Sequence, residues 1–192
     1  MNYTTRQIEI IKAASELIGE KGIQNLTTKR LAAKMNFSEP ALYRHFKGKT
    51  EILLSLLSYY IDEMKEGLTE VLNGEESGAE MIDKVISFQF NHFSKNPAIV
   101  MVIFSETSFQ YEQKLSEKVL TILHQKKELL SEIIEKGQQD QSIRNDIEKE
   151  YLSDIIMGSL RFTILRWRLT NFSFDLNNEG KMLSETLNKL LN

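Results

Sequence analysis

Residues 22–53 read GIQNLTTKRLAAKMNFSEPALYRHFKGKTEIL, and this stretch decides the fold. It predicts two short helices, one over Thr28–Met35 and one that begins after Ser38. Asn36 tolerates the left-handed conformation that ends a helix, Ser38 can cap the next helix, and Pro40 lies in its first turn, where a missing N–H costs nothing. Two short helices joined by a tight turn predict a helix-turn-helix.

The second of these helices has the properties that binding in a DNA groove requires. Its start, residues 39–41, carries short side chains that fit a major groove about 12 Å wide. Leu42 and Phe46 are four residues apart and can anchor the helix on its inner side. Residues 43–45 then face outward, and Lys49, with the free N–H groups of the next helix, can hold a phosphate. A small helical hairpin with ordinary surface charge would carry much of the same pattern.

The charge of the chain is divided unevenly. Residues 1–50 contain nine Lys or Arg and four Glu, a balance of +5, whereas residues 51–192 contain 15 basic and 23 acidic residues, a balance of −8. A basic N-terminal part on an acidic body favours contact with a polyanion at one end only. The same acidic body disfavours a strongly anionic ligand there, unless a few buried cations outweigh the balance.

Composition excludes several other classes of protein. The chain of 192 residues has no cysteine, which excludes disulfides, thiolate zinc sites and a cysteine nucleophile. It has no His-Glu-x-x-His, no Gly-rich phosphate loop and no nucleophile elbow, so we expect no enzyme, no catalytic residue, no metal and no cofactor. No signal peptide pattern or membrane-length apolar run is found, which predicts a cytoplasmic protein without a membrane partner.

The rest of the chain also predicts helices, and the fold class is all-α. Helical periodicity extends over residues 4–22, 50–72, 79–95, 97–107, 111–136, 148–170 and 175–191, for a total of about nine helices. Residues 1–48 form the predicted helix-turn-helix domain, which extends into the fourth helix to about residue 64. Residues 49–192 form the predicted helical domain for effector binding and dimerisation.

The pieces Gly22, Thr27-Thr28, Leu31-Ala32, Ser38 and Leu42-Tyr43-x-His45-Phe46-x-x-Lys49 resemble the N-terminal signature of the TetR family (TetR/AcrR-like) of bacterial transcriptional regulators. The resemblance covers residues 4–60 and is specific in its Leu-Tyr-x-His-Phe-x-x-Lys run. It implies a dimeric repressor that is released from a palindromic DNA operator by a small apolar or amphipathic effector.

The resemblance also implies roles for individual residues. The helix-turn-helix motif extends from about Thr27 to Phe46, and Thr28, Tyr43 and Lys49 would contact backbone phosphates. Arg44 is expected to contact a base, because arginine binds guanine in a bidentate manner. The full set of predicted DNA-binding residues is Thr27, Thr28, Ser38, Glu39, Pro40, Ala41, Tyr43, Arg44, His45 and Lys49.

Two further sets of residues are predicted in the body. Large deformable side chains could line an effector pocket: Phe88, Phe90, Phe93, Met101, Phe104, Phe109, Met157 and Phe162. The last two helices could form a homodimer interface through Ile155, Gly158, Ser159, Phe162, Leu183 and Leu187. The same side chains could instead fill the core of one subunit. Two other functions remain open, an effector-independent DNA-binding regulator and a helical protein–protein adaptor.

Overall fold

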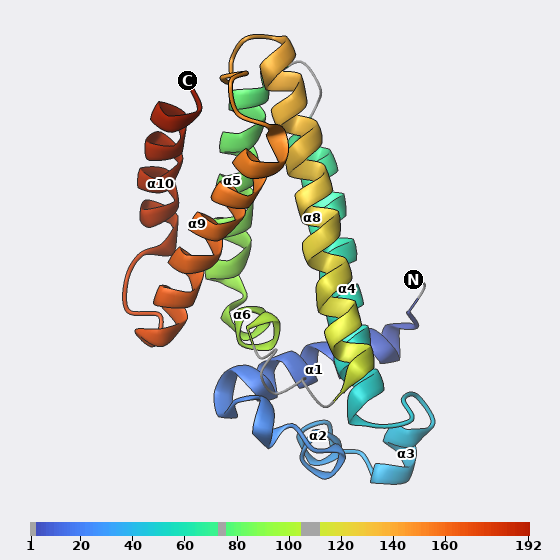
Figure 1. Ribbon diagram of the computed structural model, residues 1–192. Coiled ribbons are helices and arrows are strands. Elements are labelled where there is room, and N and C mark those ends of the chain that lie inside the picture. Colours follow the sequence, from blue (N-terminus) through green and yellow to red (C-terminus); the bar gives the residue numbers. More distant parts are fainter. Residues whose placement is uncertain (1–2, 73–75, 105–111) are drawn as a thin grey trace. The chain divides into compact units, whose positions relative to one another are not determined.

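The computed structural model describes residues 3–72, 76–104 and 112–192. Over these ranges it contains nine α-helices, a short 3-10 helix and no strand, which confirms the all-α prediction. The elements, labelled in Figure 1, are α1 Thr5–Lys21, η1 Ile23–Asn25, α2 Thr28–Lys34, α3 Glu39–Tyr43, α4 Lys49–Val71, α5 Gly78–Lys95, α6 Pro97–Ile103, α8 Gln113–Gln139, α9 Lys149–Leu169 and α10 Leu176–Leu191.

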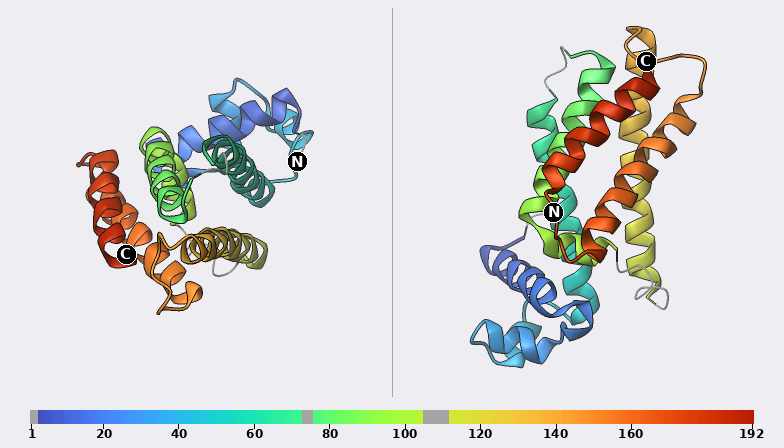
Figure 2. Two further views of the ribbon diagram at one scale, coloured as in Figure 1. Left: turned by 90° about the horizontal axis from the view of Figure 1, so that it is seen from above. Right: turned by 90° about the vertical axis from the view of Figure 1, so that its left-hand side faces the viewer.

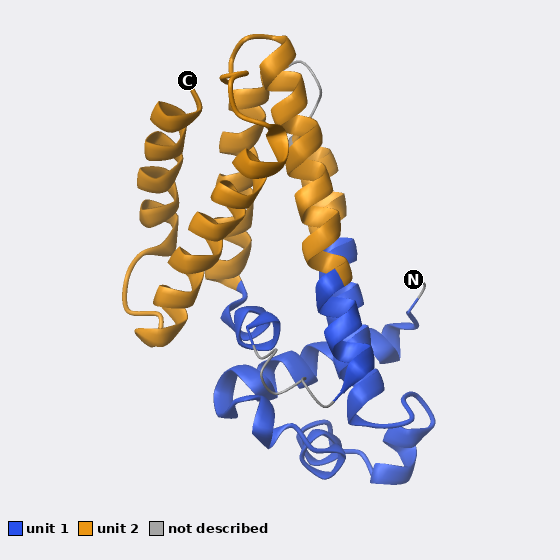
Figure 3. Ribbon diagram, viewed as in Figure 1, with its two compact units in different colours: residues 1–63, 96–120 blue, residues 64–95, 121–192 orange. Residues whose placement is uncertain are grey.

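The helices form two compact units, coloured separately in Figure 3. Unit 1 comprises residues 1–63 and 96–120, and unit 2 comprises residues 64–95 and 121–192. Both α4 and α8 therefore contribute residues to each unit. Unit 1 contains α6 in addition to the N-terminal helices. The predicted division, at residue 48 with an extension to about residue 64, instead has α6 in the second domain.

The first helix begins and ends where its sequence predicts. The Thr4 side chain accepts a hydrogen bond from the N–H of Gln7, and the Gln7 side chain accepts one from the Thr4 N–H, which completes a capping box. Gly22 ends the helix with a φ of 78°, a conformation that favours glycine. The helix is therefore specified at both ends by local chemistry.

The core of unit 1 is formed where α1 packs against α2 and α6. Ile10, Ala14 and Ile18 follow one another on the buried face of α1 and have no exposed surface. On the same helix, a Cβ added at Gly19 would lie 3.0 Å from the Cβ of Ala98 in α6, so the two helices approach closely at this point. Burial of this apolar face fixes α1 as the support on which α2 rests.

In unit 2, α5 packs along α10, and Figure 2 shows the two helices side by side. Asp83 of α5 accepts hydrogen bonds from Ser184 and, at 2.9 Å, from Asn188 of α10. Phe90 of α5 packs so closely on α10 that a Cβ at Gly180 would lie 2.7 Å from its ring. None of the helices described is long and apolar enough to cross a membrane.

Some boundaries differ from the predicted ones. The helix predicted over residues 97–107 is observed as Pro97–Ile103, and residues 105–111 lie outside the described ranges. The helix that follows begins at Gln113 and extends to Gln139, three residues further than predicted. The 3-10 turn at Ile23–Asn25 was not predicted, because three residues carry no periodic signal.

Candidate nucleic-acid interface

Helices α2 and α3 are each set by a local cap. Thr27 caps α2 by accepting a hydrogen bond from the N–H of Arg30, at 3.2 Å, and Ser38 caps α3 through the N–H of Ala41. Between the helices, Asn36 has a φ of 56°, which is the left-handed conformation predicted from its sequence position. The predicted helix-turn-helix is therefore present.

Beneath these helices lies a continuous apolar base. Leu31 and Ala32 of α2, Leu42 of α3 and Phe46 just after it are all buried. Because these four side chains point inward, the opposite sides of both short helices face solvent. Phe37 in the turn is partly exposed, and the guanidinium of Arg6 lies 4.2 Å from the centre of its ring.

All ten predicted DNA-binding residues keep exposed surface. Tyr43 is 50 % exposed and Arg44 is also exposed, in contrast to the adjacent Leu42. Thr27, Ser38 and Pro40 are exposed as well, and the partly exposed members of the set are Thr28, Glu39, Ala41, His45 and Lys49. Unit 1 thus presents together, on or beside α2 and α3, the residues that sequence reasoning selected.

One contact within this set was not foreseen. The hydroxyl of Thr28 at the start of α2 donates a hydrogen bond of 3.0 Å to a carboxylate oxygen of Glu39 at the start of α3. A hydroxyl has a single proton, so Thr28 can donate to a DNA phosphate only after it has released Glu39. In the free protein, Thr28 therefore positions the Glu39 carboxylate.

Lys49 makes a contact within the protein that the sequence did not predict. Its amine donates a hydrogen bond of 3.2 Å to the carbonyl oxygen of Ile23, which ties the start of α4 to η1. Burial lowers the pKa of the Lys49 amine from its ordinary value, and Glu112 partly opposes this change. Because an ammonium group has three protons, the bond to Ile23 leaves others for a phosphate.

Sequence reasoning missed two basic residues of this surface. Lys29 on α2 and Lys47 after α3 are both exposed, and no described carboxylate forms an ion pair with either amine. Lys34 differs, because Glu20 at 2.9 Å and Glu16 at 3.3 Å neutralise it and raise its pKa. The sequence alone could have indicated both residues, since Lys29 lies within the helix-turn-helix motif and Lys47 directly follows it.

The predicted pocket residues lie in both compact units. Unit 1 holds Met101 and Phe104, and unit 2 holds the described remainder. Phe90, Phe93 and Phe104 are buried, Phe88, Met101 and Met157 are partly exposed, Phe162 is exposed, and Phe109 lies outside the described residues. Phe162 thus has the exposure of an interface residue, which is the second role predicted for it.

The predicted dimer residues divide between α9 and α10. On α9, Ile155 is 49 % and Phe162 66 % exposed, Ser159 is partly exposed, and Gly158 has open space around it. On α10, Leu183 is partly exposed, but Leu187 is only 2 % exposed and has almost no surface left for a partner. Tyr151 and Leu169, which were not predicted, extend the exposed apolar face of α9 at both ends.

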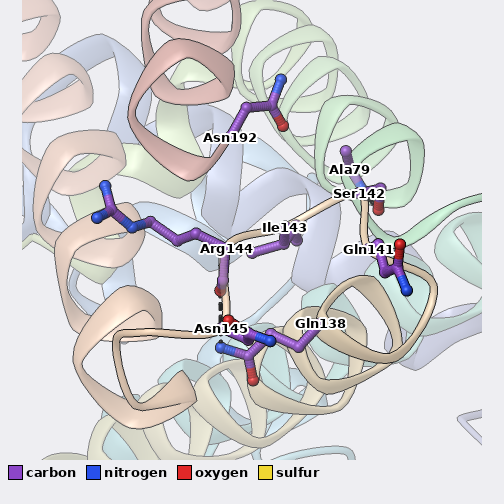
Figure 4. Close-up of a pocket in the computed structure, with 8 residues that line it drawn as sticks. All are labelled: Ala79, Gln138, Gln141, Ser142, Ile143, Arg144, Asn145 and Asn192. Atoms are coloured by element: carbon purple, nitrogen blue, oxygen red, sulfur yellow. Dashed lines mark hydrogen bonds between the residues drawn. The ribbon is translucent and has the colours of Figure 1, made fainter.

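A hollow of about 500 Å³ lies where the chain passes from α8 to α9, and Figure 4 shows its lining. It is not made of the predicted aromatic residues. Gln138 donates hydrogen bonds to the carbonyl oxygens of Arg144 and Ile147, at 3.0 and 2.9 Å, and these bonds fix the loop. The lining residues are Ala79, Gln138, Gln141, Ser142, Ile143, Arg144, Asn145 and Asn192.

Comparison with known proteins identifies the family. Residues 10–56 match a sequence model described as bacterial regulatory proteins, tetR family, and residues 55–191 match the model of the C-terminal region of YsiA-like proteins. The chain belongs to the tetR family. This tetR-family protein is accordingly a DNA-binding transcriptional regulator.

Individual relatives are more distant. The chain is 25 % identical over 171 residues to the fatty acid metabolism regulator protein of Bacillus subtilis. The matched region covers 89 % of this chain and 88 % of that protein. It is 20 % identical to the nucleoid occlusion factor SlmA of Photobacterium profundum, with the same coverage of both chains. The solved structure of FadR from Bacillus subtilis in complex with stearoyl-CoA has a TM-score of 0.81 at 24 % identity and covers 94 % of this chain and 96 % of its own.

Proposed function

We propose that this tetR-family regulator is a homodimeric repressor that binds a palindromic operator and releases it when an amphipathic small molecule binds. The observation that carries the proposal is that Tyr43 and Arg44 are exposed while the neighbouring Leu42 and Phe46 are buried. The exposed lysines Lys29 and Lys47 flank this surface. One such module covers only half a site, so specific binding requires two copies on a two-fold axis. The protein would act in the cytoplasm, on the chromosome.

The apolar face of α9 supports the dimer. Its exposed or partly exposed positions 151, 155, 158, 162, 165 and 169 follow one another at alternating steps of four and three residues. This spacing places them along one side of a helix, as in a helix–helix seam. Gly158 lies in the middle of the face and would let a second helix approach closely, since no atom of the described residues lies within 4 Å of a Cβ added there.

The proposed effector carries an acyl chain. This proposal is supported by the similarity to a regulator of fatty acid metabolism and to FadR with bound stearoyl-CoA. A ligand changes operator affinity only through its different affinities for the DNA-binding and released conformations. We therefore expect an acyl-CoA to bind the DNA-free protein more tightly than the protein on its operator.

The experiment is a titration of purified protein onto DNA from just upstream of its own gene, which we expect to contain an inverted repeat. Log K should fall linearly with log salt concentration at about −0.9 per phosphate neutralised. Addition of stearoyl-CoA should weaken operator binding. An affinity that no acyl-CoA changes would favour an effector-independent regulator, and equal affinity for the repeat and for scrambled DNA would reject the repressor proposal.

Arg44→Ala should relax sequence preference. If Arg44 contacts a guanine, its loss removes about 1–3 kcal/mol of discrimination at one base pair of each half-site. Lys47→Ala is the matched control, because a phosphate contact contributes equally on every sequence and its loss should reduce the salt slope by about one per protomer. Competition binding with operator and scrambled DNA measures both effects. Equal losses on the two DNAs for Arg44→Ala would contradict its base-reading role.

A further inference from the structure

Unit 2 contains a lysine, Lys126, whose amine contacts a neutral amide. The amine of Lys126, on α8, donates a hydrogen bond of 2.5 Å to the side-chain oxygen of Gln89 on α5, and Gln89 is itself buried. No described carboxylate forms an ion pair with Lys126. The next residue, Lys127, is paired with Asp154 at 2.7 Å, so these two adjacent lysines differ in whether a counter-charge compensates them.

This arrangement is costly for a charged group. Burial lowers the pKa of the Lys126 amine to about 7. An ammonium that is partly withdrawn from water and meets one neutral amide oxygen lacks the compensation that buried charges have when they are paired. An anion bound beside Lys126 would supply that compensation.

Uncovered apolar surface lies next to the amine. Ile122 and Leu129 are four residues before and three after Lys126, on the same side of α8, and both keep part of their surface exposed. On α5, Phe93 follows Gln89 by four residues and is buried. A cation beside incompletely covered aliphatic side chains matches a ligand with one anionic group on an apolar chain.

We propose that Lys126 and Gln89 form an anchoring site for the anionic group of an amphipathic effector, and that the side of α8 with Ile122 and Leu129 contacts its apolar chain. The inference rests on the proposed function, since it names the residues that bind the effector. The anionic group is a carboxylate or a phosphate, supplied by a free fatty acid or by an acyl-CoA. Gln89 orients the amine, and Lys126 provides the charge.

The test measures binding to the DNA-free, full-length protein by titration calorimetry. Three probes share one chain length: dodecanoic acid, dodecanoyl-CoA and dodecanol. Lys126→Gln keeps a side-chain N–H for Gln89 but removes the charge, and Lys126→Met removes both at similar length. Lys127→Met is the matched control, because it removes a neighbouring lysine whose charge is already compensated.

The wild type should bind at least one of the two anionic probes more tightly than the alcohol, and the better of the two identifies the source of the anion. Both Lys126 variants should bind that probe about ten- to a hundred-fold more weakly, because a hydrogen bond to a charged group is lost. Their affinity for dodecanol, and every affinity of Lys127→Met, should stay unchanged.

Equal losses for the acid and the alcohol, or no binding of any probe, would overturn the anchoring site. The proposed function is tested separately by release from the operator. If Lys126→Gln leaves anion binding intact while acyl-CoA still releases the DNA, the anchor is wrong and the repressor proposal stands. If the anion binds through Lys126 but never changes operator affinity, the effector proposal is wrong and the site stands.

Discussion

Phe162→Arg is expected to dissociate the dimer and with it to abolish tight operator binding. Phe162 is 66 % exposed in the single chain and lies on the apolar face of α9. Burying a phenylalanine contributes about 1.5–3 kcal/mol, and a two-fold interface counts each residue twice. A loss of about 3–6 kcal/mol in the free energy of dimerisation raises the dimer dissociation constant about a hundred-fold or more. Burying the new arginine charge would raise it further.

Sedimentation equilibrium measures the dissociation constant, and a gel-shift titration measures operator affinity. Gln139→Arg is the control, because it adds the same charge at an exposed position at the end of α8. The control should remain dimeric and bind DNA as the wild type does. A Phe162→Arg protein that stays dimeric at the wild-type constant would show that α9 does not form the interface through this face.

Gly78→Ala should destabilise unit 2 by about 3 kcal/mol or more. An added Cβ would lie 2.3 Å from both the Cα and the N of Gly137, and 2.8 Å from the carbonyl oxygen of Ile133. All three are backbone atoms of α8, so no rotation of a side chain relieves the clash. The start of α5 is also held by hydrogen bonds from the N–H of Gly78 to Asp140 and from that of Ala79 to Ser142.

Gly67→Ala provides a matched comparison. Its Cβ would also lie 2.3 Å from a neighbour, but that neighbour is the ring end of Phe88, which is partly exposed and can turn aside. The higher helix propensity of alanine should stabilise α4 by about 0.5–1 kcal/mol and so offset the cost of moving the Phe88 ring. Urea unfolding followed by circular dichroism, at one protein concentration, compares the two variants. If both variants were destabilised to the same extent, the Phe88 ring would be held as rigidly as the backbone atoms of α8.

The helix-turn-helix was predictable because its signals act over a few residues. The cap at Ser38 and the left-handed turn at Asn36 are specified within the turn, and the structure contains both. The length of α3 was less predictable. It has helical geometry only over Glu39–Tyr43, and two hydrogen bonds to the Leu42 carbonyl oxygen, from His45 and Phe46, close it as a turn.

Features that depend on contacts between distant parts of the chain were harder to predict from the sequence. Leu183 and Leu187 belong to one apolar stripe of α10, and only packing decides that Leu187 is the one enclosed within the subunit. Lys126 is similar, since a lysine on an amphipathic helix is ordinarily expected to be solvated. Its partner Gln89 is 37 residues away in sequence, and no local pattern connects the two.

The hydrogen bond between Thr28 and Glu39 has a consequence for how the protein finds its operator. A carboxylate fixed at the tip of α3 repels the phosphates of any duplex that comes near, whatever its base sequence. Chromosomal DNA offers vastly more random sites than cognate ones, and random attachment depends on phosphate attraction. By weakening that attraction, the fixed carboxylate is expected to shorten the time that each molecule spends on the wrong DNA.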